Sequence, residues 1–394
     1  MLIERQDRLR LRNWRPRNLF ESPPFWMYIA GFLLVLGPLV TVHELGHYLV
    51  GRWFGVGADA FSIGFGRELF GWTDKRGTRW KVAAIPLGGY VQFKGDMNPA
   101  SIPDPKAPVH SDSFQSQSLW KRALIVFAGP ATNLIVAIGI FFAFFAISGQ
   151  PTVTFPDDST MVSRFAEESA ARDAGVEVGD RIIAIDGQAI GDFQELIDQV
   201  ALFPNRQIEL TVERADQTLT LPVTIGSAVE EDRFGNQMTL GRLGVFRPDN
   251  GIPEVTYERL GVTEALPAAL SYTWNTFEMM MLGLKQIIVG DRSVQELGGP
   301  IKIAKYSGEQ LSLGLLAFVN FAALISLNLA FINLLPIPAL DGGHLAFYAA
   351  EAVRKKPVGP QATEWAYRTG VAIVLMLMVV VTFNDLVSLP IFGS

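Results

Sequence analysis

Four long apolar runs alternate with polar segments along this chain of 394 residues. The runs cover residues 25–50, 123–148, 313–350 and 369–390, and each is as long as a transmembrane helix, which needs about 20 residues. In the third run the strongly apolar part ends near residue 335, and a Pro-x-Pro sequence follows it. We therefore predict a polytopic α-helical membrane protein with four transmembrane helices.

The polar segments between these runs predict different structures. Residues 1–24 form a basic N-terminal arm with six arginines. Residues 51–122 are rich in glycine and alternate in polarity, which predicts short strands and turns. Residues 150–255 combine several short strands with two short helical patterns, which predicts one small soluble α+β domain. Residues 256–312 contain an amphipathic pattern over 262–289, typical of a helix at the membrane interface.

Charge indicates which side of the membrane each loop faces. Residues 51–122 hold ten lysines and arginines and residues 352–368 hold four more, so both loops are expected in the cytoplasm. The domain of residues 150–255 is then on the opposite side. The same topology places the arm of residues 1–24 outside, against its arginine content. Cysteine is absent from the chain, which excludes disulfides and thiolate-bound metals, and no dense basic patch suggests a nucleic-acid partner.

One motif in the first apolar run carries chemistry. His43 and His47 are four residues apart, so a helix presents both imidazoles on one face, where they can hold one zinc ion. Glu44 stands beside them and can take a proton from a water molecule and pass it to a leaving amine. Ionisable residues in an apolar span are costly, which favours a functional interpretation over chance.

A zinc peptidase site needs a third protein ligand. Asp341 is the leading candidate because it follows the Pro-x-Pro break at the end of the third apolar run. His344 is a rival ligand, although a role as a hydrogen-bonding partner of the site is the preferred interpretation for it. His110 lies in a polar, proline-rich stretch and is expected to be an ordinary surface histidine.

Two asparagines in the spans have alternative interpretations. Asn133 either points at the active site or bonds a neighbouring helix, and the second role is the more common one for a buried amide. A transmembrane substrate must be unwound before it is cut, and Asn333 could hydrogen-bond its extended backbone. The strand-forming loop could add an edge strand to such a substrate. The candidate substrate-binding residues are therefore Asn333, Pro336, Pro338, Gly64, Gly88 and Gly89.

Motifs along nearly the whole chain resemble the site-2 protease family of intramembrane zinc metalloproteases, in particular its bacterial regulator-of-sigma-E branch. The similar stretches are His43-Glu44-Leu45-Gly46-His47, the segments at 61–66, 85–91, 128–130 and 299–301, the run from Asn333 to His344, and Phe383-Asn384-Asp385. The resemblance implies zinc held by His43, His47 and Asp341, Glu44 as the catalytic base, and Asn333 gripping the substrate. It also implies a membrane-associated β-hairpin in residues 51–122.

Residues 150–255 resemble a circularly permuted bacterial PDZ domain, through the run Gly175-Val-x-x-Gly-Asp-Arg-Ile followed by Asp186-Gly187. Such domains bind peptide ends or extended segments. Members of the protease family act in the bacterial inner membrane with the PDZ part in the periplasm. Their substrates are single-span membrane proteins, namely pre-trimmed anti-sigma factors and remnant signal peptides. The tandem PDZ pair of the best-known branch is reduced to one PDZ pattern here.

Two other functions are compatible with parts of the pattern. A non-catalytic membrane scaffold would present its PDZ domain to other proteins, but it would be expected to lose part of the motif formed by His43, Glu44, His47 and Asp341. A metal transporter would need several weak sites along a path, whereas this chain offers a single cluster.

Overall fold

The computed structural model describes residues 23–95, 110–154, 160–231, 237–248, 254–290, 294, 297–356 and 358–387. The described chain divides into two compact units. One contains residues 148–259, and the other contains residues 23–147 together with the chain from 260 onward. The basic arm predicted over residues 1–24 lies outside the described residues apart from its last two positions.

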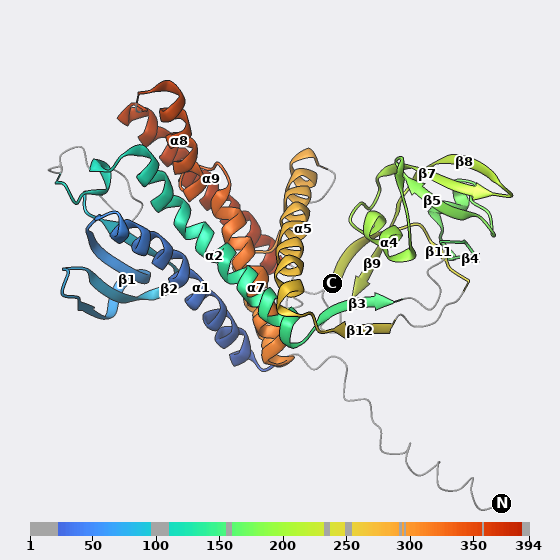
Figure 1. Cartoon of the computed structure of the whole chain (residues 1–394), viewed down its shortest axis with the longest axis horizontal. Helices are drawn as coiled ribbons and strands as arrows, with labels where there is room; N and C mark the ends of the chain where they lie inside the picture. The colour runs from blue at the N-terminus through green and yellow to red at the C-terminus, as the bar shows by residue number, and fades with distance from the viewer. Residues whose placement is uncertain are drawn as a thin grey trace, which may run out of the picture. The chain divides into compact units, whose positions relative to one another are not determined.

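Among the described residues of the second unit, four helices are long and apolar enough to cross a membrane, and they correspond to the four apolar runs. They are α1 (Phe25–Trp53), α2 (Leu119–Ile147), α7 (Leu315–Leu334) and α9 (Pro360–Val387). Helices α1, α2 and α7 lie side by side (Figure 1). The four apolar helices, together with the sheets of the chain, fit the predicted class of membrane protein with a β region.

The third apolar run forms two helices instead of one. Helix α7 ends at Leu334, and α8 (Asp341–Arg354) begins seven residues later. Pro336 and Pro338 stand between them, where their missing N–H groups and ring sterics prevent a continuous helix. The chain turns in this gap, so Asp341 becomes the first residue of a new helix and does not extend α7.

Two further helices complete the second unit. Helix α5 (Val262–Val289) has the bounds of the predicted amphipathic helix. Its small buried residues Ala265 and Ala269 pack against Phe141 of α2 and Leu327 of α7. Helix α6 (Pro300–Ser312) was not predicted as a separate element. Its N-terminus is capped by Asp385 of α9, whose carboxylate accepts hydrogen bonds from backbone N–H groups at 299, 301 and 302.

The glycine-rich loop forms a long antiparallel hairpin of β1 (Ala58–Thr73) and β2 (Arg79–Phe93). Bulges bend both strands, so residues 60–63 pair with 79–82 on one side and with 89–92 on the other. The outer part of the hairpin, residues 68–73, pairs with residues 79–83. The inner part packs on α1 around Tyr48 and Phe61, beside a 3-10 turn, η2 (Phe114–Ser116).

The unit of residues 148–259 contains a four-stranded antiparallel sheet in the order β6-β5-β7-β8. These strands are β5 (Arg181–Ile185), β6 (Gln188–Ala189), β7 (Gln207–Arg214) and β8 (Gln217–Thr224), with the helices α3 (Ala170–Asp173) and α4 (Phe193–Ala201). Three more strand pairs complete the unit. They are β3 (Gln150–Thr154) with β12 (Glu254–Glu258), β4 (Arg164–Phe165) with β11 (Val245–Phe246), and β9 (Gly226–Glu231) with β10 (Gln237–Arg242).

Local sequence signals explain several features of this unit. Asp186 and Gly187 both have positive φ angles, of 49° and 79°, as the two-residue turn between β5 and β6 requires. Ser169 caps α3 and Asp192 caps α4, each side chain accepting a backbone N–H of the first helical turn. The core between sheet and helices is apolar and includes Leu210, whose side chain is fully buried.

A buried ion pair joins the loop before β5 to β7. Both carboxylate oxygens of Asp180 lie 2.7 Å from guanidinium nitrogens of Arg214, and Asp180 also accepts the backbone N–H of Glu177 at 2.8 Å. The Asp180 side chain is 1% exposed. The hydrogen bonds from Arg214 hold the pKa of the Asp180 carboxyl below its ordinary value, although burial opposes this effect.

We predict that Asp180→Asn opens the sheet more readily, because Arg214 then loses its charged partner. Hydrogen exchange of β5 and β7 amides in the full-length protein should be about tenfold to a hundredfold faster. Asp173→Asn is the matched control, because Asp173 pairs with Arg172 on the surface and should change exchange little.

The same pair predicts a pH dependence. Because the pKa of Asp180 is lower in the folded state, its contribution to stability is complete above the ordinary Asp pKa of about 3.9 and declines as the pH falls through the folded value. Wild-type and Asp180→Asn exchange rates should therefore converge in acid. Rates that stay equally far apart at all pH values would contradict the assignment.

Candidate metal centre

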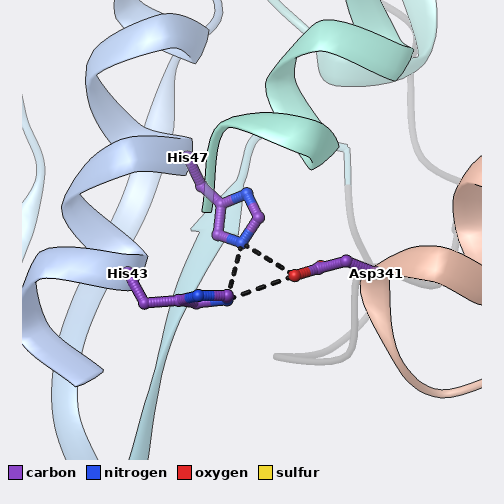
Figure 2. Close-up of side chains that lie close together, drawn as sticks. All are labelled: His43, His47 and Asp341. Carbon is purple, nitrogen blue, oxygen red and sulfur yellow. Dashed lines mark hydrogen bonds and ion pairs between the residues drawn. The ribbon is translucent and has the colours of Figure 1, made fainter. Parts of the chain in front are cut away.

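Helix α1 presents two imidazoles to one point. His43 and His47 are one turn apart, and their Nε2 atoms are separated by 3.2 Å. The rings meet edge to face, with centroids 4.8 Å apart. Figure 2 shows both side chains projecting from the same face of the helix. The helical spacing of the motif therefore brings both imidazoles to one face of α1.

The third side chain comes from the start of α8. Oδ2 of Asp341 lies 3.1 Å from Nε2 of His43 and 3.5 Å from Nε2 of His47 (Figure 2). The turn before it is tight, with a φ of 110° at Ala339. Gly342 and Gly343 allow α8 to start directly against the end of α7, because a Cβ at either position would overlap backbone atoms of the α7–α8 segment.

The separations of these three atoms suit a zinc ion. In a tetrahedral site with zinc–ligand bonds of about 2.0–2.1 Å, two ligand atoms stand about 3.3 Å apart. The three observed separations are 3.1, 3.2 and 3.5 Å. Oδ2 of Asp341 is buried and receives no hydrogen bond from the described residues. Two imidazoles and one carboxylate also match the ligand types that zinc prefers.

Helix α2 orients one of the imidazoles. Nδ1 of His47 lies 2.9 Å from the backbone carbonyl of Ile125. A carbonyl only accepts, so Nδ1 carries the proton and Nε2 keeps its electron pair for the metal. This partner was not predicted from the sequence, because a backbone carbonyl has no signature in the sequence.

Glycines let α2 come this close to the ligands. A Cβ at Gly129 would collide with Nε2 of His47 and stand 2.8 Å from Nε2 of His43. A Cβ at Gly46 would lie 2.5 Å from the backbone oxygen of Ala128. The two helix backbones therefore approach through glycine on both sides, as small residues permit in membrane helix pairs. A glycine next to a proline within an apolar span, as in Gly129-Pro130, is the sequence signal that could have indicated this contact.

A cavity of about 190 Å³ opens beside the three ligands. Its lining includes Glu44, Gly89, Asn333 and His344. The side chain of Glu44 lies against β2: a Cβ added at Gly89 would stand only 3.1 Å from Cγ of Glu44. A carboxylate, a candidate metal centre and an amide thus face the same small space, which could admit a peptide group and a water molecule.

Comparison with known proteins identifies the family of this chain. The model of peptidase family M50 matches residues 31–377. The chain belongs to peptidase family M50. A presumed zinc metalloprotease of Agrobacterium fabrum is 42% identical over 92% of this chain and 96% of its own length. A second one, from Rhizobium meliloti, is 43% identical over 91% and 96%, and metalloprotease MmpA of Caulobacter vibrioides is 34% identical over 92% and 96%.

Family membership and site geometry agree on the cofactor. This M50 protein is a zinc metalloprotease of the membrane, and the resemblance inferred from the sequence motifs is confirmed. The cluster of His43, His47 and Asp341 is the group that could hold the metal among the described residues. His344 is outside this cluster but lines the cavity, and His110 is exposed and is not among the residues that line the cavity.

The structure separates the candidate substrate-binding residues of this M50 protein into three groups. Asn333 and Gly89 line the cavity. Gly64 and Gly88 shape the hairpin instead: Gly64 has a φ of 89° beside the Ile85 carbonyl, and Gly88 faces the ring of Phe65. The prolines at 336 and 338 break the helix before Asp341 and are not among the residues that line the cavity. Their direct contact with substrate stays a prediction.

We predict that Gly129→Ala weakens zinc binding at least about tenfold, because metal sites tolerate ligand shifts of only about 0.2 Å and the new Cβ displaces both imidazoles. The measurement is zinc content of the purified protein during titration with a chelator. Gly139→Ala on the same helix is the matched control, since a Cβ there meets nothing within 4 Å. Full zinc retention by Gly129→Ala would show that α2 can shift without disturbing the ligands.

Proposed function

We propose that this M50 protein is an intramembrane endopeptidase that cuts transmembrane segments of single-span membrane proteins. The observation that carries the proposal is the position of the metal cluster. His43, Glu44 and His47 belong to α1, a helix of 29 residues that is apolar enough to cross a membrane. A metal site on such a helix can act on peptide bonds within the membrane, which a soluble protease cannot reach.

The residues around the cavity have different roles in peptide hydrolysis. Zinc, when bound, supplies a Lewis acid that polarises the scissile carbonyl and makes water more acidic. Glu44 stands next to the ligands and is the group that takes the proton of the attacking water and returns it to the leaving amine. Apolar side chains of β2 and α2, namely Val91, Phe93, Ile125 and Val126, line part of the cavity and keep other water away from that side of the reacting groups.

An edge strand offers a way to hold the substrate. Residues 89–93 of β2 pair with residues 58–63 of β1 on one side, and no described strand pairs with their other side. Gly89, Tyr90 and Val91 of this segment line the cavity. An unwound substrate can add to this edge as a further strand, which replaces the helical hydrogen bonds it has lost. Asn333 faces the same space from α7 and can bond the substrate backbone.

The far end of the hairpin supports contact with the bilayer. Leu69, Phe70 and Trp72 are more than half exposed on β1. Exposed aromatic and aliphatic side chains on a strand are costly in water but suit the lipid interface. We propose that this part of the hairpin is membrane-associated and can deform the lipid around the substrate.

The unit of residues 148–259 supports a PDZ-like role. A groove of about 590 Å³ runs between α4 and the strands β10 and β11. Its walls include Leu196 and Val200 of the helix and Leu243 and Phe246 opposite them. An extended peptide end fits such a groove by strand addition. We propose that this unit lies in the periplasm and restricts access to substrates that another protease has trimmed, such as anti-sigma factors, and to remnant signal peptides.

Charge supports an inner-membrane orientation with the active site near the cytoplasm. The hairpin region carries Arg67, Lys75, Arg76, Arg79 and Lys81. The segment after α8 carries Lys355 and Lys356. Both loops therefore favour the cytoplasmic side, and the unit between α2 and α5 follows on the other side.

We predict that Glu44→Gln retains zinc but lowers cleavage of a reporter transmembrane segment by at least about a thousandfold, because the amide cannot accept the proton. The assay uses purified protein in detergent or liposomes, with zinc content measured on the same samples. Glu168→Gln, an exposed carboxylate outside the cavity, is the control and should cleave normally. Normal cleavage by Glu44→Gln would contradict the mechanism, and a wild type that holds zinc without cutting any segment would favour a scaffold.

We predict that Asn333→Ala reduces cleavage about tenfold to a hundredfold while zinc content stays at the wild-type level, because the variant loses a hydrogen bond to the substrate backbone. Asn320→Ala, on the same helix but away from the cavity, should leave both quantities unchanged. Unchanged kinetics in Asn333→Ala would assign Asn333 to packing.

A further inference from the structure

A buried asparagine contacts the outer nitrogen of the first zinc ligand. Asn133 of α2 has no exposed surface. Its side-chain amide nitrogen, Nδ2, lies 3.3 Å from Nδ1 of His43, the ring nitrogen that points away from Asp341. Asn133 follows Gly129 by one helical turn, so both residues lie on the α2 face that packs against the ligands.

The protonation of His43 decides which amide atom must face it. For His43 to bind zinc, Nε2 must carry an electron pair, and Nδ1 of the neutral ring then carries the proton. Nδ1–H needs an acceptor, and the acceptor of an asparagine side chain is Oδ1. The two amide ends of an asparagine are distinguished by their hydrogen-bond partners. Oδ1 of Asn133 is buried and has no hydrogen-bond partner among the described residues, whereas Nδ2 faces His43. Turning the amide by half a rotation brings Oδ1 to Nδ1–H and breaks no bond to that oxygen.

Both ligand imidazoles then depend on α2 for their orientation. Ile125 accepts the outer N–H of His47 through its backbone carbonyl at 2.9 Å. The amide of Asn133, turned so that Oδ1 faces His43, accepts the outer N–H of His43 in the same way. Acceptors of this kind fix the tautomer and direction of a metal-binding histidine. Of the two, only the contact of Asn133 can be removed by substitution without altering the backbone.

A hydrogen bond from α7 holds Asn133 itself. Ser326 donates its hydroxyl to the backbone oxygen of Asn133 at 2.8 Å, and both residues are fully buried. This bond joins α2 to α7 at the same residue, but it leaves the side-chain amide unconstrained. The chain thus offers a natural comparison between a helix-packing contact and a ligand-orienting contact at one position.

We propose that Asn133 is a positioning residue of the zinc site, which accepts the Nδ1–H of His43 and thereby keeps Nε2 directed at the metal. A role in interhelical packing was the simpler expectation for a buried amide. The side chain instead directs its polar end at a metal ligand, and the packing hydrogen bond uses the backbone. The proposal rests on zinc binding and is independent of which substrate the enzyme cuts.

The test is the affinity for zinc, measured on full-length protein in detergent by competition with a chelator of known affinity. Asn133→Leu keeps the side-chain volume but removes the acceptor, so the zinc dissociation constant should rise about tenfold to a hundredfold. Asn133→Asp keeps the acceptor and the shape, so its affinity should equal or exceed that of the wild type. Ser326→Ala removes only the helix-packing bond and should bind zinc as the wild type does.

The ranking of the zinc affinities of these variants tests whether Asn133 positions His43. The proposal would be overturned if the zinc dissociation constant of Asn133→Leu were within about twofold of the wild-type value. It would also be overturned if Asn133→Asp bound zinc as weakly as Asn133→Leu. Gel filtration and circular dichroism show whether each variant is folded. If Asn133→Leu does not fold, Asn133→Ala replaces it, and an aspartate variant that binds no tighter than the alanine variant would refute the role. A wild type without zinc affinity would contradict the zinc site itself.

Discussion

Two imidazole nitrogens and one carboxylate oxygen converge within 3.5 Å of one another, and the rest of the membrane unit depends on this convergence. Three atoms that each present an electron pair repel one another in a poorly solvated interior unless a cation lies between them. Zinc is that cation in this family. Metal binding and the packing of α1, α2 and α8 are therefore coupled, because the ligands of one ion come from helices that must hold their positions within a fraction of an ångström.

Small and irregular residues make this packing possible. Gly46 and Gly129 bring α1 and α2 together, and any larger side chain at Gly129 would occupy the space of the ligand imidazoles. Pro336 and Pro338 end α7, so the carboxylate of Asp341 can leave the direction of that helix and point at the histidines. The glycines reduce side-chain packing between α1 and α2, and the prolines interrupt the helix after α7. Both features lower the stability of the fold locally, and metal coordination at the site they form offsets that cost.

The working cavity is assembled from elements that each supply one group. Helix α1 supplies Glu44, β2 supplies an unpaired edge at residues 89–93, and α7 supplies Asn333. Helix α2 lines part of the cavity with Ile125 and Val126. It also contacts the outer nitrogens of the two histidines, through Ile125 and Asn133. A site of this kind separates the parts that react from the parts that hold them in register, which is how enzymes keep reactive groups preorganised.

The sequence by itself determined the four apolar helices and the shared face of His43 and His47, because hydropathy and helical periodicity are local properties that neighbouring residues express directly. It also indicated Asp341, through the prolines that interrupt the third apolar run. Only the tertiary structure decided that Asn133 meets His43 and that Ile125 meets His47, since these contacts join positions 90 and 78 residues apart. Which side of a buried helix faces a ligand follows from how whole helices pack, and no local pattern encodes that packing.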